Sequence, residues 1–203
     1  MSTDDAVTAT EDTEQSLGPA QLKALAHPLR IQILDLLSAH SALTASGIAE
    51  LVGESSGSTS YHLRQLARHG FIQEVADRGT GRERWWERRP GGFRLGLPED
   101  PEDVAAIATS LTVALEFEKA RARKIQSLLE NSQTLDRAWL DVTRLTTTAT
   151  WLTADQMAEV GEAWDRFSET LERYSHQERT PGARPAQIHF NLFPLVDGKE
   201  NPS

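Results

Sequence analysis

Residues 56–75 read SGSTSYHLRQLARHGFIQEV, a polar-faced helical pattern that ends in glycine and continues into a short apolar run. Thr59, Leu63 and Leu66 recur at intervals of four and three residues and therefore share one helix face. The other face carries small, polar and basic side chains. A helix that packs through leucines and presents Ser, Tyr, Arg and Gln outward is typical of DNA recognition in the major groove.

The surrounding pattern predicts further helices and a β-hairpin. Pro28 suits a first helical turn, Thr44 an N-cap, and Gly53 a helix end. The expected elements are helices over 19–26, 28–39, 44–53 and 56–70, followed by strands over 71–75 and 83–88 with a glycine-containing tip between them. This order predicts a winged helix-turn-helix with a β-hairpin wing.

Helix formers dominate the second half of the chain, so the expected fold class is mainly α. Residues 100–131 begin with a strong helix start and keep an apolar stripe. A helix over 134–146, a helix behind a capping box at 153–156, and a short strand over 187–193 are expected next. We expect the winged helix to be followed by a helical dimerisation or effector domain that ends in this strand.

The predicted organisation has four segments. They are a disordered acidic tail (1–18), a winged helix-turn-helix DNA-binding domain (19–90), a linker (91–99) and a helical dimerisation and ligand-binding domain (100–203).

Charge is distributed unevenly along the chain. The net charge is −9, but residues 19–97 hold ten Lys and Arg against seven Asp and Glu. Local charge decides affinity for a polyanion, because the Debye length in cell-like salt is only about 8–10 Å. Neither an export signal nor a membrane-spanning run is visible, so we expect a cytoplasmic protein without a membrane partner.

The candidate DNA contacts lie on the 56–70 helix and at the wing tip. For base edges in the major groove we predict Ser58, Tyr61, Arg64 and Gln65. For phosphates we predict Ser56, His62 and Arg68, with Thr59 more simply packed inward. Wing contacts are expected from Arg78 and Arg82.

Three segments resemble the arsenic-repressor-type (ArsR-like) winged-helix regulators. Residues 25–34 (LAHPLRIQIL) resemble the opening of that family, and residues 58–66 (STSYHLRQL) resemble its recognition helix. The GRERWW of residues 81–86 is similar to the wing of a non-metal subgroup. The resemblance implies a homodimer that binds a palindromic operator in double-stranded DNA, usually as a repressor.

Metal sensing and catalysis are not expected. The chain has no cysteine, and its six histidines form no pair at helical ligand spacing in the expected dimerisation region. A phosphate-binding glycine loop, a nucleophile elbow and a metal motif are all absent from the sequence. We therefore predict neither a cofactor nor an enzyme activity.

Aromatic residues in the second half admit two interpretations. They form a dimer core, or they line a pocket for an apolar small molecule that relieves repression. The candidate ligand residues are Trp139, Trp151, Trp164 and Phe167. The alternative to a DNA-binding regulator is a winged-helix module that docks partner proteins.

Overall fold

The computed structural model describes residues 14–76, 78, 83–98, 100–175 and 180–199. The chain folds into two compact units, residues 1–143 and 144–203. Within the described residues, no helix is both long and apolar enough to cross a lipid bilayer.

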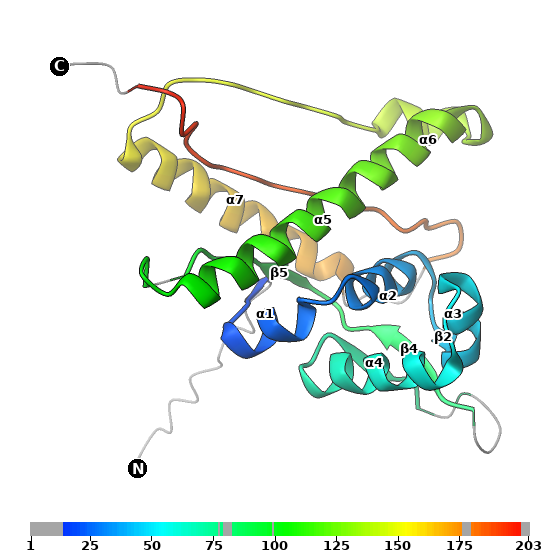
Figure 1. The fold of residues 1–203 in the computed structure, drawn as a ribbon. Helices are drawn as coiled ribbons and strands as arrows, with labels where there is room; N and C mark the ends of the chain where they lie inside the picture. The colour runs from blue at the N-terminus through cyan, green and yellow to red at the C-terminus, as the bar shows by residue number, and fades with distance from the viewer. Residues whose placement is uncertain (1–13, 77, 79–82, 99, 176–179, 200–203) are drawn as a thin grey trace, which may run out of the picture. The chain divides into compact units, whose positions relative to one another are not determined.

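The first unit is a winged helix-turn-helix followed by a long helix (Figure 1). Its helices are α1 (Pro19–Leu25), α2 (Pro28–Ala39), α3 (Ala45–Val52), α4 (Ser56–Arg68), α5 (Val104–Asn131) and α6 (Arg137–Val142), with a 3-10 turn at Ser132–Thr134. Its strands are β1 (Glu14–Ser16), β2 (Leu43–Thr44), β3 (Ile72–Glu74), β4 (Trp85–Arg88) and β5 (Gly92–Arg94). The predicted fold class, mainly α with a small antiparallel wing sheet, is confirmed.

Local caps explain where the helices of the winged helix begin. His27 precedes α2, and its Nδ1 accepts a hydrogen bond from the backbone N–H of Leu29 at 3.3 Å. Thr44 Oγ1 accepts from the N–H of Gly47 at 3.1 Å in front of α3. Gly53 then ends α3 with a φ of 71°, a left-handed conformation that glycine adopts without strain.

The wing is an antiparallel sheet in the order β2-β4-β3. Ile72 pairs with Arg88, and Glu74 pairs with Trp86. Leu43 of β2 pairs with Trp86 from the other side, so β4 is the central strand. This register turns the indole of Trp86 into the core and leaves Trp85 on the outer face.

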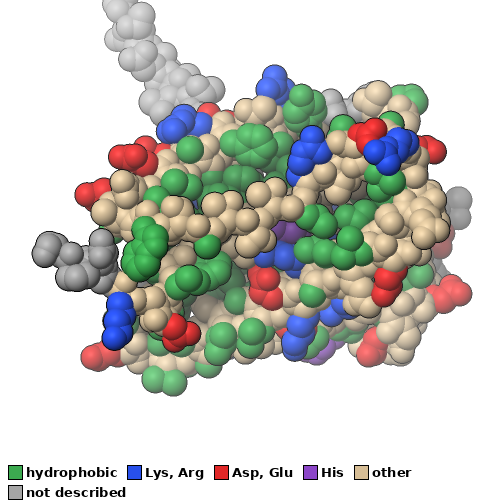
Figure 2. Space-filling model, turned by 90° about the horizontal axis from the view of Figure 1, so that it is seen from above, with side chains coloured by type: hydrophobic (Ala, Val, Ile, Leu, Met, Phe, Trp, Pro, Cys, Tyr) green, Lys and Arg blue, Asp and Glu red, His purple; other side chains and the backbone are tan. Residues whose placement is uncertain are grey.

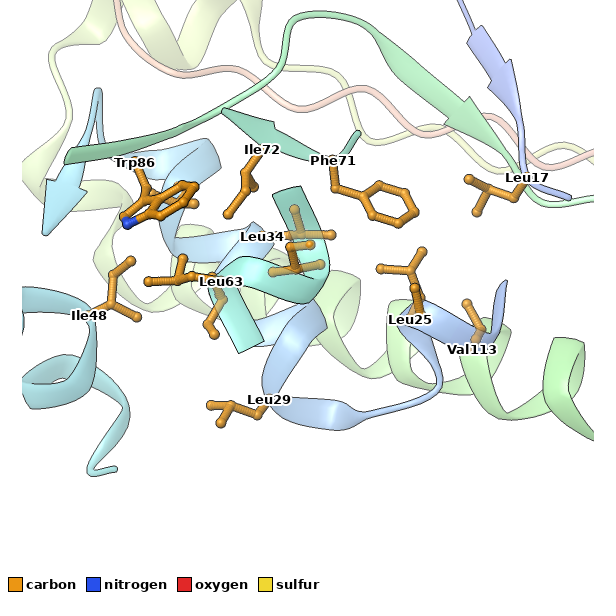
Figure 3. Close-up of a cluster of buried hydrophobic side chains, with 14 of the residues drawn as sticks. Leu17, Leu25, Leu29, Leu34, Ile48, Leu63, Phe71, Ile72, Trp86 and Val113 are labelled. Carbon is orange, nitrogen blue, oxygen red and sulfur yellow. The ribbon is translucent and has the colours of Figure 1, made fainter. Parts of the chain in front are cut away.

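The core joins the helices, the wing and α5 in one cluster. Figure 3 shows these side chains converging, among them Leu25 of α1, Ile48 of α3 and Leu63 of α4. Val113 of α5 is fully buried in the same cluster. Helix α5 therefore packs on the winged helix. The first compact unit includes α5 and α6 in addition to the winged helix. The assignment of 100–203 to dimerisation and ligand binding stays a prediction.

The prediction of a disordered tail up to residue 18 was wrong for its described part. β1 pairs in parallel with β5, with Glu14 opposite Gly92. Leu17 follows this strand and is buried in the core. Ordering this segment costs conformational entropy, and the burial of the apolar Leu17 side chain offsets that cost. A wholly polar segment would have no such gain. β5 also lies where a linker was expected. Residues 1–13 lie outside the described residues.

The second unit contains α7 (Ala154–Ser175). The predicted capping box is confirmed: Gln156 N–H donates to Thr153 Oγ1 at 3.2 Å, and Thr153 N–H donates to Gln156 Oε1 at 2.9 Å. The predicted strand over 187–193 was wrong, because this segment has no regular secondary structure and belongs to neither sheet of the described residues. The helix expected over 134–146 is shorter and is α6.

Candidate nucleic-acid interface

Helix α4 has the two faces that its sequence predicts. Thr59, Leu63 and Leu66 are fully buried against the rest of the winged helix. Ser55 Oγ caps the helix by accepting a hydrogen bond from the N–H of Ser58 at 3.1 Å. α3 and α4 lie side by side, the arrangement of a helix-turn-helix pair (Figure 1).

The outer face of α4 carries most of the predicted contact residues. The side chain of Tyr61 is half exposed, at 50%. The exposed and partly exposed members of this face are Ser56, Ser58, Tyr61, Arg64, Gln65 and Arg68. The hydroxyl, amide and guanidinium groups among them are the groups that hydrogen-bond base edges and phosphates. We call these six residues the α4 outer face.

His62 is not on that outer face. Its imidazole is buried, with 7% of the residue exposed, and its Nδ1 accepts a hydrogen bond from Arg30 Nε at 3.2 Å. The ring also lies 4.4 Å from the ring of His27 and 5.3 Å from that of Tyr61, measured between centroids. A phosphate contact was predicted for His62, but the structure places its side chain inside the domain and not on the α4 outer face.

The environment of His62 favours its neutral form. Burial lowers the pKa of His62, and repulsion from His27 and Arg30 lowers it further, while the Glu54 carboxylate acts in the opposite direction.

His27 and Arg30 fall in the segment that resembles the ArsR-like opening, but no role at the site was predicted for them. Their contacts with α4 join residues far apart in sequence, so the sequence offers no direct signal of them.

The wing presents one described arginine at its tip. The guanidinium of Arg78 lies 4.1 Å from the centre of the Trp85 ring, a cation–π contact on the exposed side of β4. Arg82 lies outside the described residues. Arg84 forms an exposed ion pair with Glu74 at 3.6 Å.

Arg88 has a different environment from the tip arginines. It donates a hydrogen bond to Ser38 Oγ at 2.7 Å, and its guanidinium lies 5.4 Å from the centre of the Phe93 ring. Burial lowers the pKa of Arg88, and the nearby Asp35 carboxylate opposes that effect. Arg88 is thus an internal structural group of the wing.

The candidate ligand residues are divided between the two compact units. In the second unit, Trp164 stacks on Phe190 with a centroid distance of 4.5 Å and an interplanar angle of 3°, and Phe167 lies 5.4 Å from Trp164. Trp151 is 77% exposed. Trp139 lies on α6 in the first unit. The structure therefore brings Trp164 and Phe167 together, with Phe190 as a third ring.

Comparisons with known proteins match the winged-helix segment. The model of a helix-turn-helix domain family matches residues 25–75. The HTH-type transcriptional regulator YgaV of Escherichia coli K12 is 36% identical over 58 residues, which are 29% of this chain and 59% of YgaV. The match thus spans less than two thirds of that relative.

Solved structures are similar only at low identity. The adhesin competence repressor AdcR of Streptococcus pyogenes is 14% identical, with 71% of this chain and 81% of that chain covered and a TM-score of 0.29. The heme sensor PefR of Streptococcus agalactiae is 11% identical, with 78% and 83% covered and a TM-score of 0.31. These low TM-scores carry no functional information about this chain. Residues 25–75, by contrast, form a helix-turn-helix domain.

Proposed function

We propose that this chain is a homodimeric, sequence-specific regulator of transcription of the ArsR-like type, which binds duplex DNA through the α4 outer face. The observation that carries the proposal is the two-sided character of α4. Its leucines anchor it in the core, while Tyr61, Arg64 and Gln65 face away from the core. Such a helix can enter a major groove without unfolding any part of the domain.

The two faces of α5 support the homodimer. Val113 belongs to the core of the winged helix and Phe117 packs against that core, whereas the opposite side of α5 carries exposed apolar residues. At about 100° per residue these fall on one stripe, formed by Val104, Leu111, Leu115 and Leu129. Figure 2 shows one face of the protein, on which hydrophobic side chains are exposed among charged ones. An exposed apolar stripe is a typical protein interface, and two-fold symmetry would match a palindromic operator.

Repression, and its relief by an apolar small molecule, are the finer parts of the proposal. Trp164 and Phe167 are the ligand candidates that lie together. Phe190 covers one face of the Trp164 indole, so a planar ligand would compete with this ring for the same stacking surface. This contact also agrees with the other interpretation, a packed aromatic core.

The test of the proposal is a pair of substitutions on the α4 outer face. Arg64→Ala combined with Gln65→Ala removes two groups that reach base edges and leaves the buried leucines in place. We expect wild-type protein to bind duplex DNA with a steep salt dependence and the double variant to lose specific binding while it stays folded and dimeric. The matched control is Gln133→Ala with Arg137→Ala, which removes the same chemical groups outside α4.

Two outcomes would contradict the proposal. Unchanged DNA binding by the double variant would remove α4 as the recognition helix. Absence of salt-sensitive binding by the wild type, together with stable capture of a defined partner protein by the winged helix, would favour the protein-docking module instead.

A further inference from the structure

We infer that Arg30 and His62 are positioning residues for DNA recognition: the hydrogen bond between them fixes how α4 is rotated and placed against α1 and α2. We call this contact, with its anchor on the Ala24 carbonyl, the Arg30 bridge. The inference rests on the proposed function, because it concerns how the α4 outer face is held for DNA.

One guanidinium connects three helices. Arg30 lies in the first turn of α2, and its Nε donates to His62 Nδ1 of α4 at 3.2 Å. Its Nη1 donates to the backbone carbonyl of Ala24 in α1 at 2.6 Å. Guanidinium nitrogens are fixed in one plane, so two such bonds restrain both helices relative to α2.

The bridge supplies a directional restraint that the core lacks. Leu63 and Leu66 anchor α4 by apolar contact, and apolar attraction does not depend on direction. A hydrogen bond weakens steeply when its geometry changes. Reading a base edge needs side chains held within a fraction of an ångström. The Arg30 bridge is connected to Tyr61 through His62, because the Tyr61 ring contacts the His62 ring edge-on.

The bridge requires one protonation state of His62. Nδ1 accepts from Arg30, so it carries no proton, and the neutral ring bears its hydrogen on Nε2. The groups that face this ring are His27 at the N-cap of α2, Arg30 itself, Glu54 after α3 and Tyr61 on α4. Protonation of His62 would convert the acceptor into a second donor opposite Arg30 and break the bridge.

Substitutions separate positioning from direct contact with DNA. Arg30→Met keeps the aliphatic stem without donors, His62→Phe keeps a ring without an acceptor, and His62→Gln keeps an acceptor. We expect Arg30→Met and His62→Phe each to weaken binding to an operator selected from random duplexes about tenfold. Non-specific binding should fall less than twofold. Because the two residues act as a pair, the double variant should be no weaker than either single variant, and His62→Gln should restore most of the affinity.

The salt dependence of binding decides between the two roles of Arg30. A positioning residue leaves the slope of log K against log salt unchanged, as the control Arg137→Met should. A decrease of about one in that slope for Arg30→Met would identify a direct phosphate contact and overturn the inference. Additive losses in the double variant, or operator binding unchanged in both single variants, would also overturn it.

A measurement without DNA keeps the inference testable if a variant fails to fold. Nitrogen-15 NMR of the wild-type imidazoles at pH 7.5 should show His62 as the Nε2–H tautomer with Nδ1 as acceptor. An Nδ1–H tautomer or a charged ring would overturn the Arg30 bridge itself. If the wild type binds no duplex, the proposed function fails and so does this role, whereas wild-type binding with unaffected variants contradicts the positioning role alone.

Discussion

Lys124 of α5 holds its Nζ atom 2.5 Å from the Asp35 Oδ1 atom of α2, so an ion pair joins the long helix to the winged helix beside their apolar contact. The Lys124 and Asp35 side chains are 33% and 22% exposed, which makes the pair partly shielded from water. Asp35 also lies near Arg88 of the wing. This carboxylate is therefore an anion shared between α5 and the wing strand β4.

Because Asp35 interacts with both Lys124 and Arg88, replacing Asp35 should lower the free energy of unfolding more than replacing Lys124 does. Lys124→Gln should lower the free energy of unfolding by about 0.5–1 kcal/mol, as expected for a partly exposed pair. Asp35→Asn should cost more, because it also removes the anion near the buried Arg88 guanidinium. Urea denaturation of the two variants and the double variant measures this. Equal costs would contradict the shared role.

The buried hydroxyl of Thr59 suggests a substitution inside α4 that leaves the free energy of unfolding unchanged or raises it. Its Oγ1 atom is buried and has no hydrogen-bond partner among the residues that the structure describes. Thr59→Val removes this hydroxyl and keeps the shape, so we expect a change in the free energy of unfolding of less than about 0.5 kcal/mol or a gain. Thr59→Ser, the control, deletes the buried methyl and should cost about 1 kcal/mol. Thermal unfolding compares them, and a larger loss for Val than for Ser would show that the hydroxyl is paired.

The lowered pKa of His62 predicts how stability depends on pH. The unfolded chain binds a proton at His62 with the ordinary pKa of about 6.5, whereas the folded chain resists it. The contribution of His62 to stability is therefore complete above about pH 6.5 and is lost as the pH falls through that value toward the lowered pKa. Denaturation between pH 5.5 and 7.5 should show a steeper loss for the wild type than for His62→Gln. Parallel profiles would contradict the prediction.

The wing predicts a sequence-independent contribution to DNA affinity. Arg78→Ala should weaken binding to selected and mixed duplexes by the same factor and reduce the salt slope by about one, because the proposed contact of this tip arginine is with phosphates. Fluorescence anisotropy at several salt concentrations measures both quantities. An unchanged slope would mean that the Arg78 guanidinium, stacked on Trp85, serves only the wing itself.

The elements predicted well from the sequence are those whose signals are local. Pro28, Thr44 and Gly53 mark helix boundaries through caps that involve only neighbouring residues, and Leu63 and Leu66 define the inner side of α4 by spacing alone. The outer face of α4 follows from the same periodicity. These features need no knowledge of distant parts of the chain.

The elements missed are those that depend on distant partners. β1 exists because residues 14–16 pair with residues 92–94, and the EQS sequence of that strand carries no apolar alternation. His62 falls at the boundary between the two faces of α4, and only the contact with Arg30, 32 residues earlier, shows that it is internal. Residues 187–193 alternate like a strand, but Phe190 stacks on Trp164 instead of pairing in a sheet.

Selection of duplexes from a random library by the wild-type protein, followed by sequencing, tests whether α4 binds DNA with sequence specificity. We expect one enriched motif with two inverted half-sites whose centres lie about one helical turn apart, and loss of that enrichment when Arg64 and Gln65 are both replaced by alanine. Enrichment of the same motif by the double variant, or a library that stays random after selection by the wild type, would contradict sequence-specific recognition through α4.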